Sequence, residues 1–235
     1  MGKFNVKWEA FADSWREGGD ARVIEGLKNT LTIAIIGLVI GIVIGVIIAV
    51  VRVMPKYKLL PKILDKICYI YTSFFRGTPM VVQLLVGYYV LFPLMGITVS
   101  SLVTCIIIFG LNSGAYLSET MRAGINSVDS GQMEAGRALG LSYGATMIKI
   151  VVPQAIKNIL PTIGNEFISL IKETSVVSFV GAVDLYNAFR YIGSNNYEFM
   201  VPYLIMAMFY IVIVLIISLG IKLMERSLRK SDRRN

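Results

Sequence analysis

Long stretches without a charged residue constrain this chain more than any other feature. Leu31–Val51 contains no charged residue over 21 positions, and Phe199–Ile221 is another such run. At 1.5 Å per helical residue, 21 residues measure about 30 Å, enough to cross the hydrocarbon core of a bilayer. Hydrophobic residues make up 55% of the chain and charged residues only 16%, which is a membrane composition. The sequence therefore predicts an all-α membrane protein.

The other apolar segments predict three further spans. Gly77–Ser118 carries no charge over 42 residues, which is too long for one helix, and Pro93–Gly96 marks a turn inside it. The first of its two spans is expected to begin near Leu64 and to be interrupted at Arg76–Pro79. Another span is expected at Leu160–Val180, despite its charged residues, because the topology requires it. The prediction is five transmembrane helices.

The basic residues predict the orientation, because Lys and Arg concentrate in cytoplasmic loops. Of the 23 basic residues, 14 lie between the first two spans, in the region Arg122–Lys149, which includes the loop at 126–150, or after the last span. This places that loop and the C-terminus in the cytoplasm and the N-terminus outside. The predicted division is an extracytoplasmic segment at 1–29, a transmembrane domain at 30–222 and a basic cytoplasmic tail at 223–235. The first segment has aromatic residues at helical spacing, which predicts an amphipathic helix at the outer interface; they are Phe4, Trp8, Phe11 and Trp15.

A polar island at 126–161 interrupts the apolar runs and predicts two short helices with a hinge. Asp129 or Ser130 is a suitable N-cap for the first helix, and Gly140 can end it in the left-handed conformation. Ser142 can begin the second helix. We call residues 126–150 the coupling loop.

The first of these helices has the features of a surface on which a cytosolic partner docks. Ala135, Gly136 and Ala138 are small enough for another backbone to approach closely. Glu134 and Arg137, three residues apart, give the helix a polar edge.

Several motifs resemble those of a known family. Glu134–Gly136, Gly140 and Ile159–Pro161 resemble the coupling-loop signature of ABC importer permeases. Other segments resemble the polar amino acid branch of that family; they are Arg76–Pro79, Gly114–Ile125, Gly131-Gln132, Pro153–Ala155 and Lys172–Ser175. The resemblance runs from about Gly26 to the C-terminus. Gly136 departs from it, because the family usually has a second Ala there, and this lowers helix propensity by about 1 kcal/mol.

The resemblance implies a type I ABC importer permease fold in a bacterial cytoplasmic membrane. It implies that two cytosolic ATPase subunits dock on the coupling loop, that a second permease subunit, itself or a homologue, completes the pathway, and that an extracytoplasmic binding protein delivers an amino acid. The implied ATPase contacts are Gly131, Gln132, Glu134, Ala135, Gly136, Arg137, Ala138, Leu139 and Gly140.

The chain lacks the motifs of an enzyme. It has no Gly-x-x-x-x-Gly-Lys-Ser/Thr loop and no His, so ATP and Mg²⁺ are expected on a partner ATPase and no metal site is expected here. The net charge of +8 is explained by basic residues beside apolar runs rather than by nucleic acid binding.

Polar side chains at membrane depth are candidates for a substrate pathway, because buried ionisable groups are costly there. An amino acid needs an acceptor for its ammonium group and donors for its carboxylate. The candidates are Thr78, Gln83, Asn112, Tyr116, Glu119, Glu166 and Lys172. Glu119 has two interpretations, a partner for the ammonium group or a pair with Arg122. In the first case Glu119→Gln would weaken uptake of cationic amino acids more than of neutral ones.

Three questions stay open at this point. The chain could instead be an ion-gradient-driven transporter or channel, with Glu119 and Glu166 carrying protons or cations, or a membrane scaffold that transports nothing. Gly37, Gly41 and Gly45 form a stripe that lets a helix approach closely, within the subunit or between subunits. The amino acid carried is not specified.

Overall fold

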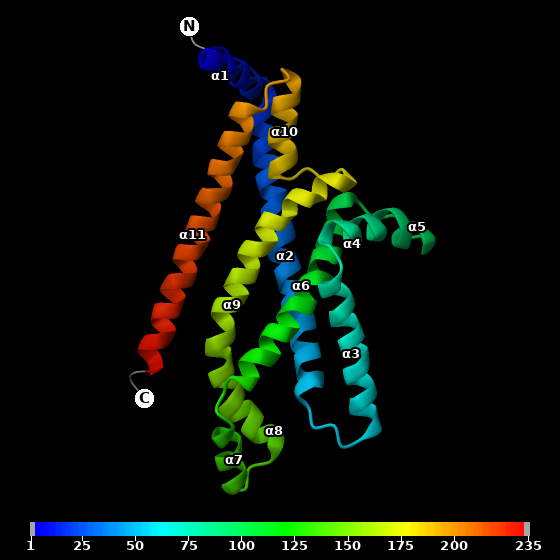
Figure 1. Cartoon of the computed structure of the whole chain (residues 1–235), viewed down its shortest axis with the longest axis vertical. Helices are drawn as coiled ribbons and strands as arrows, with labels where there is room; N and C mark the ends of the chain where they lie inside the picture. The colour runs from blue at the N-terminus through cyan, green and yellow to red at the C-terminus, as the bar shows by residue number, and fades with distance from the viewer. Residues whose placement is uncertain (1–2, 233–235) are drawn as a thin grey trace.

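The computed structural model describes the backbone of residues 3–232 and the side chains of residues 4–228. This part of the chain is folded into helices (Figure 1). The α-helices are α1 (Lys3–Ser14), α2 (Asp20–Val53), α3 (Leu59–Gly77), α4 (Met80–Val86), α5 (Phe92–Leu94), α6 (Ser101–Asn126), α7 (Ser130–Ala138), α8 (Tyr143–Thr146), α9 (Val152–Glu173), α10 (Leu185–Asn195) and α11 (Met200–Asp232). Three π-helical turns and one 3₁₀ helix connect some of them; they are η1 (Trp15–Gly19), η2 (Gly87–Leu91), η3 (Met147–Val151) and η4 (Thr174–Val180).

Within the described residues, three helices are long and apolar enough to cross a membrane, and they contain α2, α6 and α11. A fourth span is formed if α3 and the α4–α5 segment count together, because these meet at a bend of 107°. The predicted interruption is confirmed, since α3 ends at Gly77 and α4 begins at Met80. The predicted turn is also confirmed, with Gly96 at φ +69. The predicted span at Leu160–Val180 corresponds to α9 and η4, which are not among these candidate spans. The count of five therefore stays a prediction.

The packing of α2 against α6 settles the glycine stripe as a seam within the subunit. A Cβ on Gly41 would lie 2.6 Å from Ser113 Oγ, so only glycine allows the two backbones this approach. The pattern is reciprocal, because Gly110 and Gly114 of α6 receive Ile40 and Ile44 of α2. Buried residues of both helices contribute to two hydrophobic clusters along this contact.

The N-terminal segment is helical, as predicted, but half of its aromatic stripe packs inward. Phe4 and Trp8 are about half exposed, whereas Phe11 is buried in a cluster with Phe189 of α10. Lys7 forms an ion pair of 2.9 Å with Glu198, and the hydrogen bond from Lys7 lowers the pKa of that carboxyl group. The α2 helix begins ten residues before the predicted domain boundary, so the boundary at residue 29 falls inside a continuous helix.

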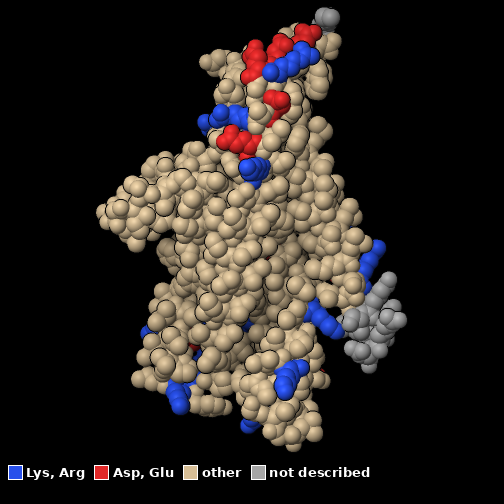
Figure 2. All heavy atoms as spheres, turned by 180° about the vertical axis from the view of Figure 1, so that it is seen from behind, with Lys and Arg blue, Asp and Glu red and all other residues tan. Residues whose placement is uncertain are grey.

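Charged side chains gather toward the two ends of the molecule on the face drawn in Figure 2, with a largely uncharged belt between them. The end that holds α1 and α10 carries both signs, and the end that holds α7 and α8 is mainly basic. The predicted basic tail begins inside α11, which continues to Asp232. Residues 1–2 and 233–235 of the predicted terminal segments lie outside the described residues.

The seam gives a test with a matched control. Gly41→Ala would push a methyl group against Ser113, whereas a methyl group on Gly220 of α11 would meet no atom within 4 Å. We expect Gly41→Ala to lower the free energy of unfolding by about 1–3 kcal/mol and Gly220→Ala to leave it unchanged or raised by up to about 1 kcal/mol. Thermal unfolding in detergent measures both. Equal midpoints for the two variants would contradict the seam.

Candidate functional site

The coupling loop has the two predicted caps. Asp129 Oδ1 accepts a hydrogen bond of 2.7 Å from the backbone N–H of Gly131, which starts α7. At the other end Gly140 has φ +81, and the N–H of Leu141 donates to the carbonyl of Gly136 at 3.1 Å. This pattern closes a helix through a left-handed glycine. The α7 helix therefore has a hydrogen-bonded cap at each of its ends.

The second helix of the loop explains the departure at Gly136. Ser142 Oγ accepts from the N–H of Ala145 at 3.2 Å and begins α8, as predicted. Gly136 is the buried residue of α7, and a Cβ there would overlap Thr146 Cγ2. The small residue thus serves contact between α7 and α8 inside the loop, rather than contact with a partner.

The other predicted docking residues lie on the surface. Leu139 is 81% exposed at the end of the loop, although it is apolar. The remaining exposed ones are Gly131, Gln132, Glu134, Ala135, Arg137, Ala138 and Gly140. The structure therefore presents a capped helix with eight of the nine predicted residues accessible.

Three hydrogen bonds tie the loop to the helical bundle. Tyr143 Oη donates to the carbonyl of Val53, the last residue of α2, at 3.1 Å. Asn158 of α9 donates to Ser127 Oγ at 3.0 Å, and Gln154 donates to Gln132 at 3.3 Å. Burial raises the pKa of the Tyr143 phenol, so it remains a hydrogen-bond donor at neutral pH. These hydrogen bonds would transmit a movement of the loop directly to α2 and α9.

Comparison with known proteins identifies the family of the chain. A family model described as "Binding-protein-dependent transport system inner membrane component" matches residues 37–230. The chain belongs to this family. It is a type I ABC importer permease of the polar amino acid branch, as the motifs predicted, and a multi-pass membrane protein whose family relies on a partner ATPase and a binding protein.

Individual relatives cover most of the permease. The arginine transport system permease protein ArtQ of Bacillus subtilis (strain 168) is 38% identical over 210 residues, which cover 89% of this chain and 94% of that protein. The putative glutamine transport system permease protein GlnP of Rickettsia typhi is 39% identical, with 88% and 92% covered.

Solved structures agree on the fold. The crystal structure of an amino acid ABC transporter with histidines contains a chain that matches this one with a TM-score of 0.82 and 36% identity, covering 88% of this chain and 94% of that one. An inward-facing MetNI methionine transporter has a TM-score of 0.74 at 17% identity, covering 88% and 95%, which supports the fold alone.

Glu119 of the permease is held between two guanidinium groups. Arg122 donates to Glu119 Oε2 from Nε at 3.1 Å and from Nη2 at 2.7 Å, and Arg52 of α2 donates to Oε1. Asp65 of α3 extends the network, 3.8 Å from Arg52 Nε and 2.7 Å from Lys56 Nζ. Of the two interpretations of Glu119, this geometry favours ion pairing.

Polar side chains beside the helix break form hydrogen bonds with one another and with the backbone carbonyl groups at the break. Gln83 Nε2 donates to the Phe75 carbonyl at 2.8 Å and to the Thr78 carbonyl at 2.9 Å, while its Oε1 accepts from Asn112 at 2.9 Å. The Thr78 hydroxyl donates to the Phe74 carbonyl at 2.8 Å. These three candidates satisfy the carbonyl groups that the break leaves open, so they act first as supports of the bend.

The other pathway candidates lie apart from one another. Tyr116 is partly exposed on α6, with Arg76 5.5 Å from its ring centroid. Glu166 is half-buried on α9, and Lys172, near the end of α9, lines a cavity with α10 and α11. The structure therefore does not join all seven candidates into one site.

Some functional candidates were missed in the sequence. In the sequence Arg52 is only one of the basic residues between the first two spans, and neither Asp65 nor Tyr143 was singled out. Their partners are distant in the chain, 67 residues for Arg52 and Glu119 and 90 for Tyr143 and Val53, so no local pattern could reveal them.

The network predicts the effect of Glu119→Gln. The substitution leaves Arg122 with a neutral partner and leaves Arg52, whose side chain is only 12% exposed, with the carboxylate of Asp65 at 3.8 Å. We expect the free energy of unfolding to fall by about 2 kcal/mol, and uptake of cationic and neutral amino acids to fall in equal proportion. Thermal unfolding and paired uptake assays measure this, with Glu25→Gln on the exposed outer part of α2 as the control. A selective loss of cationic substrates would restore Glu119 to the pathway.

Proposed function

We propose that the permease forms half of the translocation pathway of an ATP-driven importer for polar amino acids. It pairs with a copy of itself or a homologue, and two cytosolic subunits bind ATP and Mg²⁺. The N-terminus lies outside and the C-terminus in the bacterial cytoplasm. The observation that carries this proposal is the capped, exposed α7 helix, which is tied to α2 and α9 by hydrogen bonds.

The transported amino acid is proposed from the relatives. ArtQ is named for arginine and GlnP for glutamine. Both are polar amino acids, and relatives of this identity support that class without selecting one member. Selection can reside largely in the binding protein, so we propose a class rather than a single substrate.

The proposed mechanism is alternating access driven through the coupling loop. Closure of the ATPase subunits moves α7. The loop transmits this movement because α7 packs closely against α8 at Gly136. The hydrogen bonds of Tyr143 and Asn158 pass it to α2 and α9. The helices then tilt as rigid bodies between outward-facing and inward-facing arrangements.

Ion-pair geometry weighs against the gradient-driven alternative. A proton carrier needs a carboxylate that can lose its partner during the cycle. Glu119 instead accepts hydrogen bonds from two guanidinium groups, so it would have to break two ion pairs to carry a proton. The capped loop also has no role in such a transporter.

Uptake into proteoliposomes tests the proposal. The permease is reconstituted with its co-purified ATPase and binding protein, and a labelled amino acid panel is offered with ATP or with a pH gradient. We expect accumulation with ATP only. Uptake driven by the gradient without ATP would contradict the importer.

A charge reversal tests the docking surface. Glu134→Lys places a cation on the exposed edge of α7, and a loss of about 1.4 kcal/mol in docking lowers assembly about tenfold. We expect less ATPase to co-purify and uptake to fall accordingly. The control is Glu25→Lys, also exposed but at the opposite end. Normal co-purification with Glu134→Lys would remove α7 from the interface.

Tyr143→Phe tests transmission rather than docking. The substitution removes the hydrogen bond to Val53 and keeps the ring. We expect normal ATPase assembly, but about two- to tenfold fewer amino acids transported per ATP, because one hydrogen bond contributes about 0.5–1.5 kcal/mol. Tyr57→Phe in the α2–α3 loop is the control, since Tyr57 is 93% exposed. An unchanged transport ratio would contradict this link.

A further inference from the structure

A groove on the lateral surface of the bundle lies between α2, α6 and α9 and has a volume of about 300 Å³. Among the described residues that line it, every side chain is aliphatic or a methionine. Ala49 of α2 and Ala155 of α9 form its floor, because both are buried and their small side chains leave space between the helices. Val50 and Ile156 are about half exposed and form its rim. The groove is therefore open to the surroundings of the bundle.

The volume of the groove excludes a helix as its occupant. One turn of an α-helix is about 5.4 Å long and about 10–12 Å across with its side chains, which corresponds to about 500 Å³. A groove of about 300 Å³ takes a thinner ligand. An aliphatic lining also requires a ligand without polar atoms, because a polar group there would lose its hydrogen bonds to water. A hydrocarbon chain meets both conditions.

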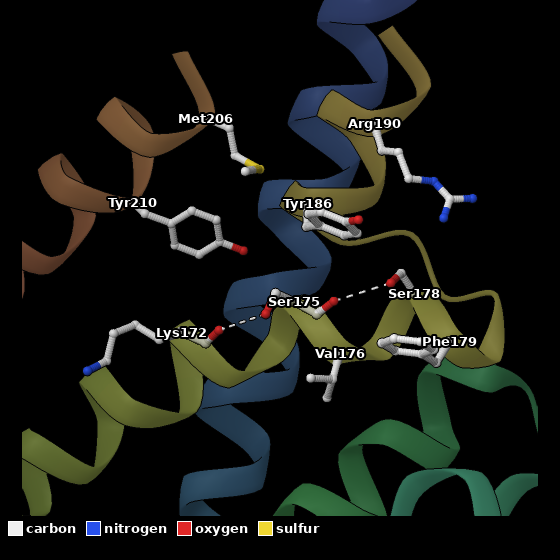
Figure 3. A pocket seen from close by; sticks show the side chains of 9 residues that line it. All are labelled: Lys172, Ser175, Val176, Ser178, Phe179, Tyr186, Arg190, Met206 and Tyr210. Carbon is white, nitrogen blue, oxygen red and sulfur yellow. Dashed lines mark hydrogen bonds between the residues drawn. The ribbon is translucent and has the colours of Figure 1, made fainter. Parts of the chain in front are cut away.

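The groove differs in chemistry from the larger cavity where the end of α9 meets η4, α10 and α11 (Figure 3). That cavity has a volume of about 530 Å³, and its wall includes Lys172 and Arg190, which stand on opposite sides of it. Charged and hydroxyl-bearing walls suit water and polar solutes, whereas the aliphatic groove suits lipid.

The groove lies beside the coupling loop. Ile125, one residue before the loop, and Val152, two residues after it, both line the groove. Val50 lies three residues before Val53, whose carbonyl accepts the hydrogen bond from Tyr143. An occupant would therefore contact all three helices near the end where the loop is attached.

The same end provides a positive charge. Lys149 lies three residues before Val152, is exposed, and has no carboxylate within 4.0 Å in the part of the chain that the structure describes. Its neighbour Ile148 is apolar and yet 70% exposed. An exposed apolar side chain next to a lysine is typical of the level at which hydrocarbon gives way to headgroups. The end that holds α7 and α8 is mainly basic (Figure 2), which is complementary to an anionic headgroup.

We propose that this groove binds a phospholipid with an anionic headgroup, with one acyl chain between α2, α6 and α9 and the headgroup phosphate beside Lys149. The proposed orientation places this end in the cytoplasmic leaflet, whose anionic lipids attract basic residues. The site rests on that orientation and adds a lipid to the proposed importer. A lipid in this position touches the three helices to which the coupling loop is attached.

Photo-cross-linking to the purified permease–ATPase complex tests the site. The probes are phosphatidylglycerol and phosphatidylcholine, each with a photoactivatable group on one acyl chain, added in neutral detergent at low salt. We expect phosphatidylglycerol to label groove residues such as Val50 and Ile156 about fivefold more than phosphatidylcholine, the effect of one basic residue beside an anionic headgroup. The preference should disappear in about 1 M salt, which screens exposed charges.

Variants at Lys149 test the headgroup contact. Lys149→Gln should abolish the preference for phosphatidylglycerol and leave labelling by phosphatidylcholine unchanged. Lys149→Arg should keep the preference, which separates loss of the charge from poor folding. The control is Lys58→Gln, an exposed position in the α2–α3 loop, and it should behave as wild type.

A variant at the rim tests the acyl chain. Val46 lines the groove and is about half exposed, so Val46→Trp can cover the groove without overpacking the core. We expect labelling of α9 by both lipids to fall about tenfold, the effect of losing roughly two methylene groups of burial. Val43→Trp is the control, because Val43 is also about half exposed on α2 but does not line the groove. Equal thermal midpoints show that both variants fold.

Several results would overturn the site. They are wild-type labelling only outside the groove, equal labelling by the two lipids, and a preference that survives in Lys149→Gln. Benzoylphenylalanine in place of Val50 tests the other occupant: cross-links to lipid support the site, whereas cross-links to a second permease chain would make the groove an interface between subunits. Failure of the proposed function is distinguishable, because wild-type uptake would then not depend on ATP, whereas failure of the lipid site leaves that dependence intact.

Discussion

The close approach of α2 and α6 is the constraint on which the rest of the permease depends. Glycine on both helices brings the backbones near enough for Ile40 and Ile44 to fill the facing gaps. In a membrane this packing has to come from shape, because lipid tails are as apolar as the helices and give little hydrophobic drive for association. The seam then fixes which side chains meet at its end.

At that end ion pairs, rather than glycine contacts, join α2 to α6. The last contact of the stripe, Gly45 with Leu117, is followed within two turns by Arg52 on α2 and Glu119 on α6. Asp65 of α3 joins the same network, so three helices are tied at one level. Tyr143 binds the carbonyl of Val53, the residue after Arg52. The coupling loop is therefore attached directly beside this network of ion pairs, which suits a part that transmits force.

The coupling loop shows how far local chemistry predicts structure. Asp129, Gly140 and Ser142 act as predicted, because capping and left-handed glycine depend on residues within four positions. The helix break before Pro79 follows for the same reason. The partner of Gly136 was not predictable, since Thr146 lies on the next helix and only the folded loop brings the two together. The orientation in the membrane and the number of spans remain predictions from charge and hydropathy.

The sequence by itself determined the membrane character, the helix break, the two-helix coupling loop and the family, because these depend on charge-free length, caps and motif order. The tertiary structure decided that the glycine stripe is internal and that Glu119 pairs with Arg52 as well as Arg122. It also decided that Gln83 supports the bend, and that Lys172 and Arg190 share a cavity. The physical reason is the same in each case, because these contacts join helices that are distant in the chain, and only packing sets their distance and direction.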